Sequence, residues 1–291
     1  MMYILLAVLL LVCPVAATEE RAGLFVRDNT RAYLHIPWEN KSVSWEFMKK
    51  NWGIWNIYAV SINKEYISGT SGTDWEYVYY GKPIGGKELA WMGGNHGNEQ
   101  LKTLEFFVDG KDITYGKVKI KNNLTIIETT DLVYPEGNLV VGSVIRKYVI
   151  NMSNPSRFDF SQETVWHKDM VIDRAFICML PIMKKHGRHF EMGSLKDSFV
   201  NNVRTDGRKG YQKVTETFMY GDNNWGIIAG IESLDAVENY QHTSGGAYIW
   251  DLSNDQVKLY YPRVVSSGLL PVKAGEIWAN NSYYIVTQTD R

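Results

Sequence analysis

The segments LVVGSVIRKYVINM at residues 139–152 and FDFSQETVWH at 158–167 decide the fold class. Apolar β-branched or aromatic residues alternate with polar ones along both, and successive side chains of a strand point to opposite faces. Arg146 and Tyr148 therefore share one face of the first segment. Asn154-Pro155-Ser156 between the two segments is typical of a tight turn, so the sequence predicts a pair of neighbouring strands.

Strand-like alternation recurs over most of the remaining chain. Turn signals such as Asp109-Gly110 separate the segments. The further strands expected from this pattern are 55–62, 75–80, 104–108, 112–115, 117–129, 213–220, 225–231, 247–252, 256–261 and 282–287. Residues 42–50 are compatible with one short helix that turns Val43 and Phe47 inward, and the basic segment 183–210 is expected to be an irregular loop or lid.

The arrangement of these segments indicates the architecture. Amphipathic helices that would connect parallel strands are not recognisable in the sequence, which argues against an α/β fold. The sequence therefore predicts an all-β protein, an antiparallel two-sheet β-sandwich of jelly-roll or supersandwich type with minor helix. Neither a repeat nor a linker divides residues 18–291, so they are expected to form a single domain.

The chain begins with an apolar run that ends in Pro14-Val15-Ala16-Ala17. This run is too short to span a bilayer, and Val15 and Ala17 suit the small-residue rule for cleavage. The sequence thus predicts a signal peptide at residues 1–17 and a secreted, extracellular protein. Cleavage would leave Cys178 as the only cysteine, and its apolar surroundings predict a buried, unreactive thiol.

The charges of the chain are balanced, with 31 Lys and Arg against 32 Asp and Glu. Both signs are spread along the sequence without long runs, which excludes a composition-based argument for binding nucleic acid or a membrane surface. The 10 Trp and 18 Tyr suit a sandwich core, and they equally suit walls on which sugars stack.

The stretch WMGGNHGNE at residues 91–99 is the densest group of reactive side chains. Glycines permit positive φ and close approach of the backbone to a ligand, while Asn, His and Glu supply donors, acceptors and a titratable proton. We expect a site loop here, leading into a strand.

Residues 93–99 resemble the Gly-Gly-x-His-Gly-Asn-Glu segment of the aspartoacylase and succinylglutamate desuccinylase family of zinc hydrolases. The resemblance implies that His96 and Glu99 bind zinc, with a later histidine such as His167 as third ligand and a water in the open position. It covers seven residues. The family's downstream Asp-Leu-Asn-Arg segment is absent, and its fold is a mixed sheet flanked by helices.

As an expected secreted β-sandwich, the protein also resembles the polysaccharide lyases of jelly-roll and supersandwich type. That resemblance implies β-elimination on an acidic, uronate-containing polysaccharide, without a cofactor. The reaction needs a group that neutralises the carboxylate, a base for the C5 proton and an acid for the leaving oxygen. The candidates are Asn95, Asn98 or Arg146 as neutraliser, His96 or His167 as base and Tyr148 as base or acid, with Trp91 and Lys168 as further substrate-binding residues.

A third interpretation is a non-catalytic carbohydrate-binding β-sandwich. In that case the glycine-rich stretch is only a tight turn, and the aromatic residues stack on sugars. The sequence leaves the lyase, the zinc hydrolase and the binding module open, with His96 central to the first two.

Overall fold

The computed structural model describes residues 22–38, 40–51, 53–68, 75, 78–200, 202–205, 207–232, 246–265 and 268–289. The signal peptide expected at 1–17 lies outside these residues. Within them the helical elements are α1 (Lys184–Gly187), η1 (Gly94–His96) and η2 (Glu136–Asn138). No helix in this part of the chain has the length and hydropathy needed to cross a membrane.

The strands of the described residues form three antiparallel sheets. Sheet A has the order β10-β1-β2-β3-β4-β5 and contains β1 (Gly23–Val26), β2 (Arg31–Trp38), β3 (Lys41–Lys49), β4 (Trp55–Ile62), β5 (Glu65–Tyr66) and β10 (Gly116–Lys119). Sheet B has the order β17-β20-β21-β14-β6-β7, with β22 also paired to β14. Its strands are β6 (Val78–Pro83), β7 (Ala90–Met92), β14 (Met170–Met183), β17 (Arg208–Gln212), β20 (Gly246–Asp251), β21 (Gln256–Val264) and β22 (Leu270–Val272).

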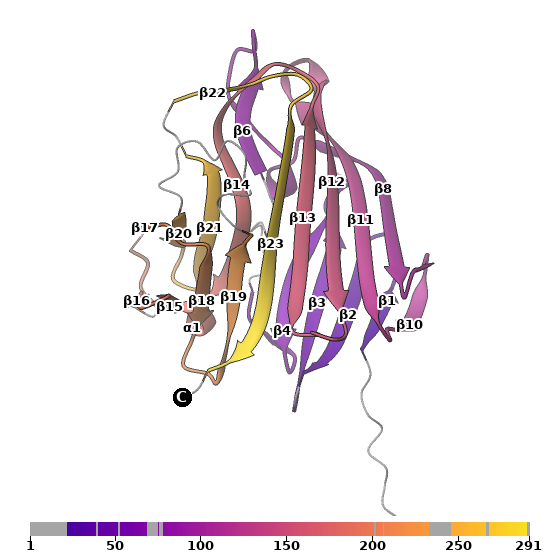
Figure 1. Cartoon of the computed structure of the whole chain (residues 1–291), viewed down its shortest axis with the longest axis vertical. Helices are drawn as coiled ribbons and strands as arrows, with labels where there is room; N and C mark the ends of the chain where they lie inside the picture. The colour runs from indigo at the N-terminus through magenta and orange to yellow at the C-terminus, as the bar shows by residue number, and fades with distance from the viewer. Residues whose placement is uncertain are drawn as a thin grey trace, which may run out of the picture.

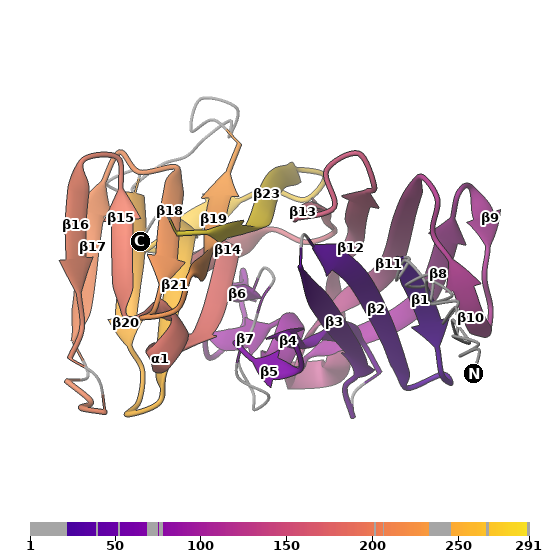
Figure 2. The same cartoon turned by 90° about the horizontal axis from the view of Figure 1, so that it is seen from below.

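Sheet C is the largest and has the order β16-β15-β18-β19-β23-β13-β12-β11-β8-β9. Its strands are β8 (Glu99–Val108), β9 (Lys111–Asp112), β11 (Asn123–Tyr134), β12 (Leu139–Asn151), β13 (Arg157–Trp166), β15 (His189–Met192), β16 (Leu195–Ser198), β18 (Glu216–Tyr220), β19 (Trp225–Ile231) and β23 (Ile277–Gln288). Figure 1 shows β11, β12 and β13 overlying β2 and β3 of sheet A, with β14, β20 and β21 of sheet B to one side. Strands β1–β3 and strands β15–β21 lie at opposite ends of the molecule (Figure 2).

Sheets A and B both pack on one face of sheet C. Phe158 and Tyr284 are directly opposite each other on β13 and β23, so their side chains share that face. Phe158 stacks on Trp45 of sheet A with ring centroids 4.6 Å apart, and the Tyr284 hydroxyl donates to the Met179 carbonyl of sheet B at 2.7 Å. The predicted all-β antiparallel sandwich is thus confirmed. Sheet C forms one layer, and sheets A and B together form the other.

The short helix predicted over residues 42–50 is wrong, because this segment is strand β3. Val43, Trp45 and Phe47 alternate into the core, each with about 2 % of its surface exposed. The segment pairs with β2 on one side and β4 on the other. Residues four apart lie on one face in a helix and in a strand alike, and the buried Trp45 between them distinguishes the two.

The single strand predicted over residues 117–129 is also wrong, because the chain changes layers within it. Strand β10 belongs to sheet A and β11 to sheet C. The Asp109 carboxylate accepts hydrogen bonds from the backbone N–H groups of Lys121, Asn122 and Asn123 at 3.0, 2.7 and 3.0 Å. These bonds hold the chain where it passes from sheet A to sheet C. Asp109 itself belongs to the predicted hairpin turn between β8 and β9.

The segment 183–210 is more regular than expected for a lid. It contains α1, β15, β16 and the start of β17. Lys184 is buried against Asp251, and His186 is buried with its Nδ1 2.7 Å from the side-chain amide of Asn223. Cys178 is buried as predicted, and this burial raises the pKa of its thiol to about 12.

Candidate functional site

The backbone of the loop at residues 93–99 explains most of its unusual composition. Gly93, Gly94 and Gly97 have φ of 94°, 54° and 76°, and Asn98 has φ of 54°. Glycine adopts such angles without steric cost, and Asn tolerates them better than most residues. The Asn98 side chain donates to the Trp91 carbonyl oxygen at 2.7 Å. Asn98 thus fastens the loop to β7.

Glu99 anchors the loop from the opposite side. This first residue of β8 is only 2 % exposed, and its Oε2 accepts a hydrogen bond from Gly94 N at 2.8 Å. Its Oε1 accepts a hydrogen bond from the Thr130 hydroxyl and lies 2.6 Å from Arg146 Nη2. Both carboxylate oxygens therefore bind groups of the protein.

The zinc ligands expected from the local resemblance do not come together. His96 is exposed and stacks on Trp91 with ring centroids 4.4 Å apart, whereas Glu99 is buried beside a guanidinium. His167 Nε2 lies 3.1 Å from Ser143 Oγ. No cluster of three or more His, Cys, Asp or Glu side chains suited to a metal occurs in the described residues. A zinc ion on Glu99 would meet the positive charge of Arg146, so the residues do not fit this metal.

Arg146 lies at the centre of a buried ionic network. Its Nη2 contacts Glu99, its Nη1 lies 3.4 Å from Glu128 Oε2, and its Nε donates to Gln162 Oε1 at 2.7 Å. Two carboxyl groups thus share one guanidinium. Burial, with a smaller contribution from the nearby Glu99 charge, raises the pKa of Glu128 to about 7 against the opposing effect of Arg146.

The network continues into the other two sheets. Gln162 Nε2 donates to the Tyr79 hydroxyl on β6 of sheet B at 2.9 Å. Glu128 Oε1 accepts from the backbone N–H of Trp55 on β4 of sheet A at 2.7 Å. The buried polar groups therefore connect all three sheets at the middle of the molecule.

Arg146 and Tyr148 do share a face of β12, as the alternation predicts. The expectation that this face opens on a substrate cleft is wrong, because Arg146 is fully buried and Tyr148 is 3 % exposed. Tyr148 packs between aromatic rings, with the Phe47 centroid at 6.0 Å and the Phe160 centroid at 4.8 Å. Sheet A covers this part of the strand.

The remaining predicted site residues are dispersed. Asn95 is half-buried in η1 beside His96. His167 contacts Ser143, which lies on the face of β12 opposite to Arg146. Lys168 is exposed and lines a cavity of about 430 Å³ with Asp169, Tyr134 and Glu136. The structure therefore brings His96, Asn95 and Trp91 together. It places His167 and Lys168 elsewhere on the surface, and it buries Arg146 and Tyr148.

Trp91 belongs to a group of rings on the outer face of sheet B. We call this group the aromatic face; its members are Tyr80, Trp91, Phe176, Tyr248, Trp250 and Tyr260. Tyr260 and the buried Met179 lie opposite each other in the sheet, as do Tyr80 and Trp91. The neighbouring side chains point the other way and are buried in the core between the layers: Tyr79, Met92, Ile249 and Tyr261.

The rings of the aromatic face contact one another without interruption from the loop to β20. Trp91 lies 4.8 Å from Tyr80 and 6.0 Å from Phe176, measured between centroids. Phe176 lies 5.0 Å from Tyr260, and Tyr260 lies 5.4 Å from Tyr248. Trp91, Phe176, Tyr248 and Trp250 are half-buried, so they retain accessible surface.

Cationic side chains accompany these rings. The Arg174 guanidinium lies 5.6 Å from the Tyr80 centroid, and that of Arg208 lies 4.5 Å from the Trp250 centroid. Lys258 precedes Tyr260 by two residues on β21 and shares its side of the strand. The surface is therefore both aromatic and positively charged.

Sequence reasoning missed every member of the aromatic face except Trp91. The available signal was the pairs Tyr79-Tyr80 and Tyr260-Tyr261, since adjacent residues of a strand must face opposite sides. In each pair one ring enters the core and the other remains on the outer surface of sheet B.

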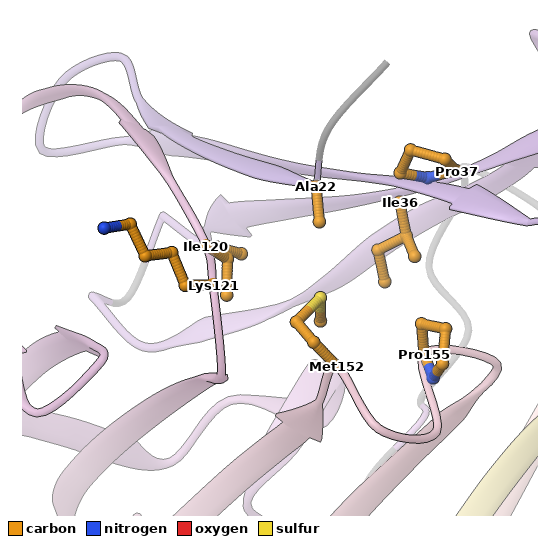
Figure 3. A pocket seen from close by; sticks show the side chains of 7 residues that line it. All are labelled: Ala22, Ile36, Pro37, Ile120, Lys121, Met152 and Pro155. Atoms are coloured by element: carbon orange, nitrogen blue, oxygen red, sulfur yellow. The ribbon is translucent and has the colours of Figure 1, made fainter. Parts of the chain in front are cut away.

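A second cavity has a different lining from the aromatic face. It has a volume of about 410 Å³ and is lined by Ala22, Ile36, Pro37, Ile120, Lys121, Met152 and Pro155 (Figure 3). Only Lys121 among them carries a charge, and no cluster of polar groups converges on the space. Ligand sites usually combine apolar walls with a few such groups, so the aromatic face is the stronger candidate.

Several solved structures resemble this chain in fold. No family model and no curated protein matches the chain. The GH36 α-galactosidase AgaB from Geobacillus stearothermophilus superimposes with a TM-score of 0.56 at 9 % identity, over 88 % of this chain and 40 % of that one. The chain thus spans about two fifths of the α-galactosidases that it resembles.

Two shorter proteins resemble the chain over most of their own length. A putative aldose 1-epimerase from Klebsiella pneumoniae gives a TM-score of 0.54 at 8 % identity, over 89 % of this chain and 80 % of that one. A galactose mutarotase related enzyme from Lactobacillus acidophilus gives 0.50 at 9 % identity, over 88 % and 98 %. The fold is shared with these proteins. At such identities the likeness extends to the fold alone.

We predict that Arg146→Leu lowers the free energy of unfolding by about 3–5 kcal/mol, because it leaves two buried carboxyl groups without their cation. Urea unfolding would measure the loss. The exposed neighbour Lys147 provides the control, and Lys147→Ala should change stability by no more than about 0.5 kcal/mol. Equal stability of the two variants would contradict the structural role of Arg146.

The free energy of unfolding should depend on pH through Glu128. The pKa of Glu128 is raised from 4.5 to about 7 in the folded protein, so the native state holds a proton that the unfolded state releases within this interval. This contribution to stability is complete below pH 4.5 and is lost as pH rises towards 7. Glu128→Gln should remove that part of the pH dependence in urea unfolding, whereas Glu163→Gln, at an exposed position, should retain it. Identical profiles for all three proteins would refute the assignment.

Proposed function

We propose that the protein binds an acidic polysaccharide on the aromatic face of sheet B. The observation that carries this proposal is the continuous set of rings, half-buried except for the buried Tyr260, accompanied by Arg174 and Arg208. Aromatic rings stack on the apolar faces of sugars, and guanidinium groups pair with carboxylates. A large apolar patch that retains exposure is typical of a binding surface.

Other observations support the same proposal. The resembling structures carry names of sugar-processing enzymes, α-galactosidase and aldose 1-epimerase. The signal peptide expected at residues 1–17 agrees with a secreted protein that meets extracellular polymers. The function requires neither a cofactor nor a contact with nucleic acid or membrane.

A second candidate function is cleavage of the bound polymer by β-elimination, and the placement of His96 favours it. Its exposed imidazole lies parallel to the Trp91 ring, with an angle of 13° between the planes. A sugar beside Trp91 would therefore meet a titratable group. Arg174 and Tyr80 take the roles first expected of Arg146 and Tyr148. The Arg174 guanidinium lies 5.6 Å from the centroid of the Tyr80 ring.

The steps of this reaction can be assigned to these residues. Arg174 pairs with the uronate carboxylate, and neutral His96 removes the C5 proton. The C5–H electron pair forms the C4–C5 double bond as the C4–O bond breaks, and Tyr80 donates a proton to the leaving oxygen. The products are an unsaturated uronate end and a free hydroxyl on the other fragment.

Trp91→Ala should weaken binding of the polymer about tenfold, since one lost stacking contact is worth about 1 kcal/mol or more. Affinity electrophoresis in gels containing alginate, glucuronan, pectate, hyaluronan or ulvan would measure this. Tyr115→Ala removes a ring that is 64 % exposed outside the aromatic face, and it should change nothing. Equal retardation of both variants and the parent protein in every gel would refute binding at this surface.

His96→Ala separates the two candidate functions. It should abolish ultraviolet-absorbing unsaturated products if the protein is a lyase, while retardation in the gel and the melting temperature remain nearly unchanged. Undiminished product formation by this variant would exclude His96 as the base. Binding without any unsaturated product from the parent protein would leave a binding protein only.

A further inference from the structure

We infer that the bound polysaccharide crosses the strands of sheet B from Trp91 to Trp250, and that Arg208 binds an acidic group at the far end. This inference rests on the proposed function and specifies the ligand as a chain of several anionic units. The strands of sheet B lie in the order β17-β20-β21-β14-β6-β7.

Nearly every strand in this order contributes a side chain to the outer surface. Tyr80 on β6 lies opposite Trp91 on β7, and Tyr248 on β20 lies opposite Tyr260 on β21. Arg208 on β17 lies opposite Trp250 on β20. Residues directly opposite each other in a sheet point to the same side, so all these groups lie on the outer surface. Trp250 lies two residues beyond Tyr248 along β20, and the Tyr80–Trp91 pair is displaced further along the strands, so the groups form a row that crosses the strands obliquely.

The dimensions of the row match those of a sugar chain. Neighbouring strands are about 4.8 Å apart, which is close to the length that one pyranose unit adds to an extended chain. The contacts between rings from Trp91 to Tyr248 repeat at a similar interval, with centroid distances of 6.0, 5.0 and 5.4 Å. A chain that follows this oblique row would therefore place roughly one unit at each step from Trp91 to Arg208, or about six in all.

The two ends of the row differ in charge. Near Trp91, the Arg174 side chain also contacts Asp173, with Nε 3.2 Å from Oδ2, so part of its charge is balanced within the protein. At the other end Arg208 is exposed, and its guanidinium lies 4.5 Å from the Trp250 ring. Lys258 shares this side of β21. The Trp250 end is thus suited to a carboxylate or sulfate on a sugar that contacts the indole.

Gly210 of β17 keeps this end of the row flat. It lies opposite Tyr248, and a Cβ atom at this position would come within 2.9 Å of the Tyr248 ring. A larger side chain would have to displace that ring. Gly210→Val therefore changes the shape of the far end without removing an aromatic or a charged group.

Isothermal titration with oligoglucuronates and oligogalacturonates tests the inference. Affinity should rise from dimer to tetramer to hexamer and then level off at the octamer. Trp250→Ala, Arg208→Gln and Gly210→Val should each weaken hexamer binding about tenfold and leave dimer binding unchanged, whereas Trp91→Ala should weaken both. Hexamers with carboxyl groups reduced to hydroxymethyl should bind the parent protein more weakly and should not respond to Arg208→Gln.

Arg157→Gln is the matched control, because Arg157 also lies over a ring, 4.2 Å from the Tyr283 centroid on sheet C. Its affinities should equal those of the parent protein. Affinity that does not depend on chain length, or hexamer binding unaffected by Trp250→Ala and Arg208→Gln, would overturn the inference and leave the proposed function intact. Absence of binding by every oligosaccharide would overturn both.

Discussion

The buried ion pair between Arg146 and Glu99 is the interaction on which the rest of the structure depends. Both side chains are shielded from water, and the same guanidinium contacts Glu128 and Gln162. Buried charges are costly unless they are paired and hydrogen-bonded, so these groups must occupy fixed positions. Through Trp55 and Tyr79 the same network reaches sheets A and B, which makes it the point where the three sheets are aligned.

The network also determines where the candidate site lies. Glu99 binds Arg146 with one carboxylate oxygen and the backbone of Gly94 with the other. The loop between them has positive φ angles that three glycines adopt without steric cost and that Asn98 tolerates. Trp91 and His96 are consequently held against the edge of sheet B, where the aromatic face begins. The buried charges therefore hold Trp91 and His96 in position without being part of the aromatic face.

Much of the fold follows from alternation along the strands, and so does the sharing of one face by Arg146 and Tyr148. Alternation cannot tell which layer covers that face, and sheet A buries it. Segment 42–50 was ambiguous because Val43 and Phe47 fit both a helix and a strand. The sequence indicated the loop at His96 correctly, since positive φ selects glycine. The pairs Tyr79-Tyr80 and Tyr260-Tyr261 indicate that each of their strands carries an outward ring. They do not show that these rings meet, because Phe176, Tyr248 and Tyr260 lie on separate strands that only the sheet brings together.

The central claim is that Trp91 and the rings beyond it form the surface that binds an acidic sugar chain. A crystal structure of the protein with a uronate hexasaccharide tests this most directly. The account predicts sugar density along the outer side of sheet B, with one unit against Trp91 and a carboxylate beside Arg208. Density confined to the cavity near Met152 or to the one near Lys168, with the aromatic face unoccupied, would contradict it.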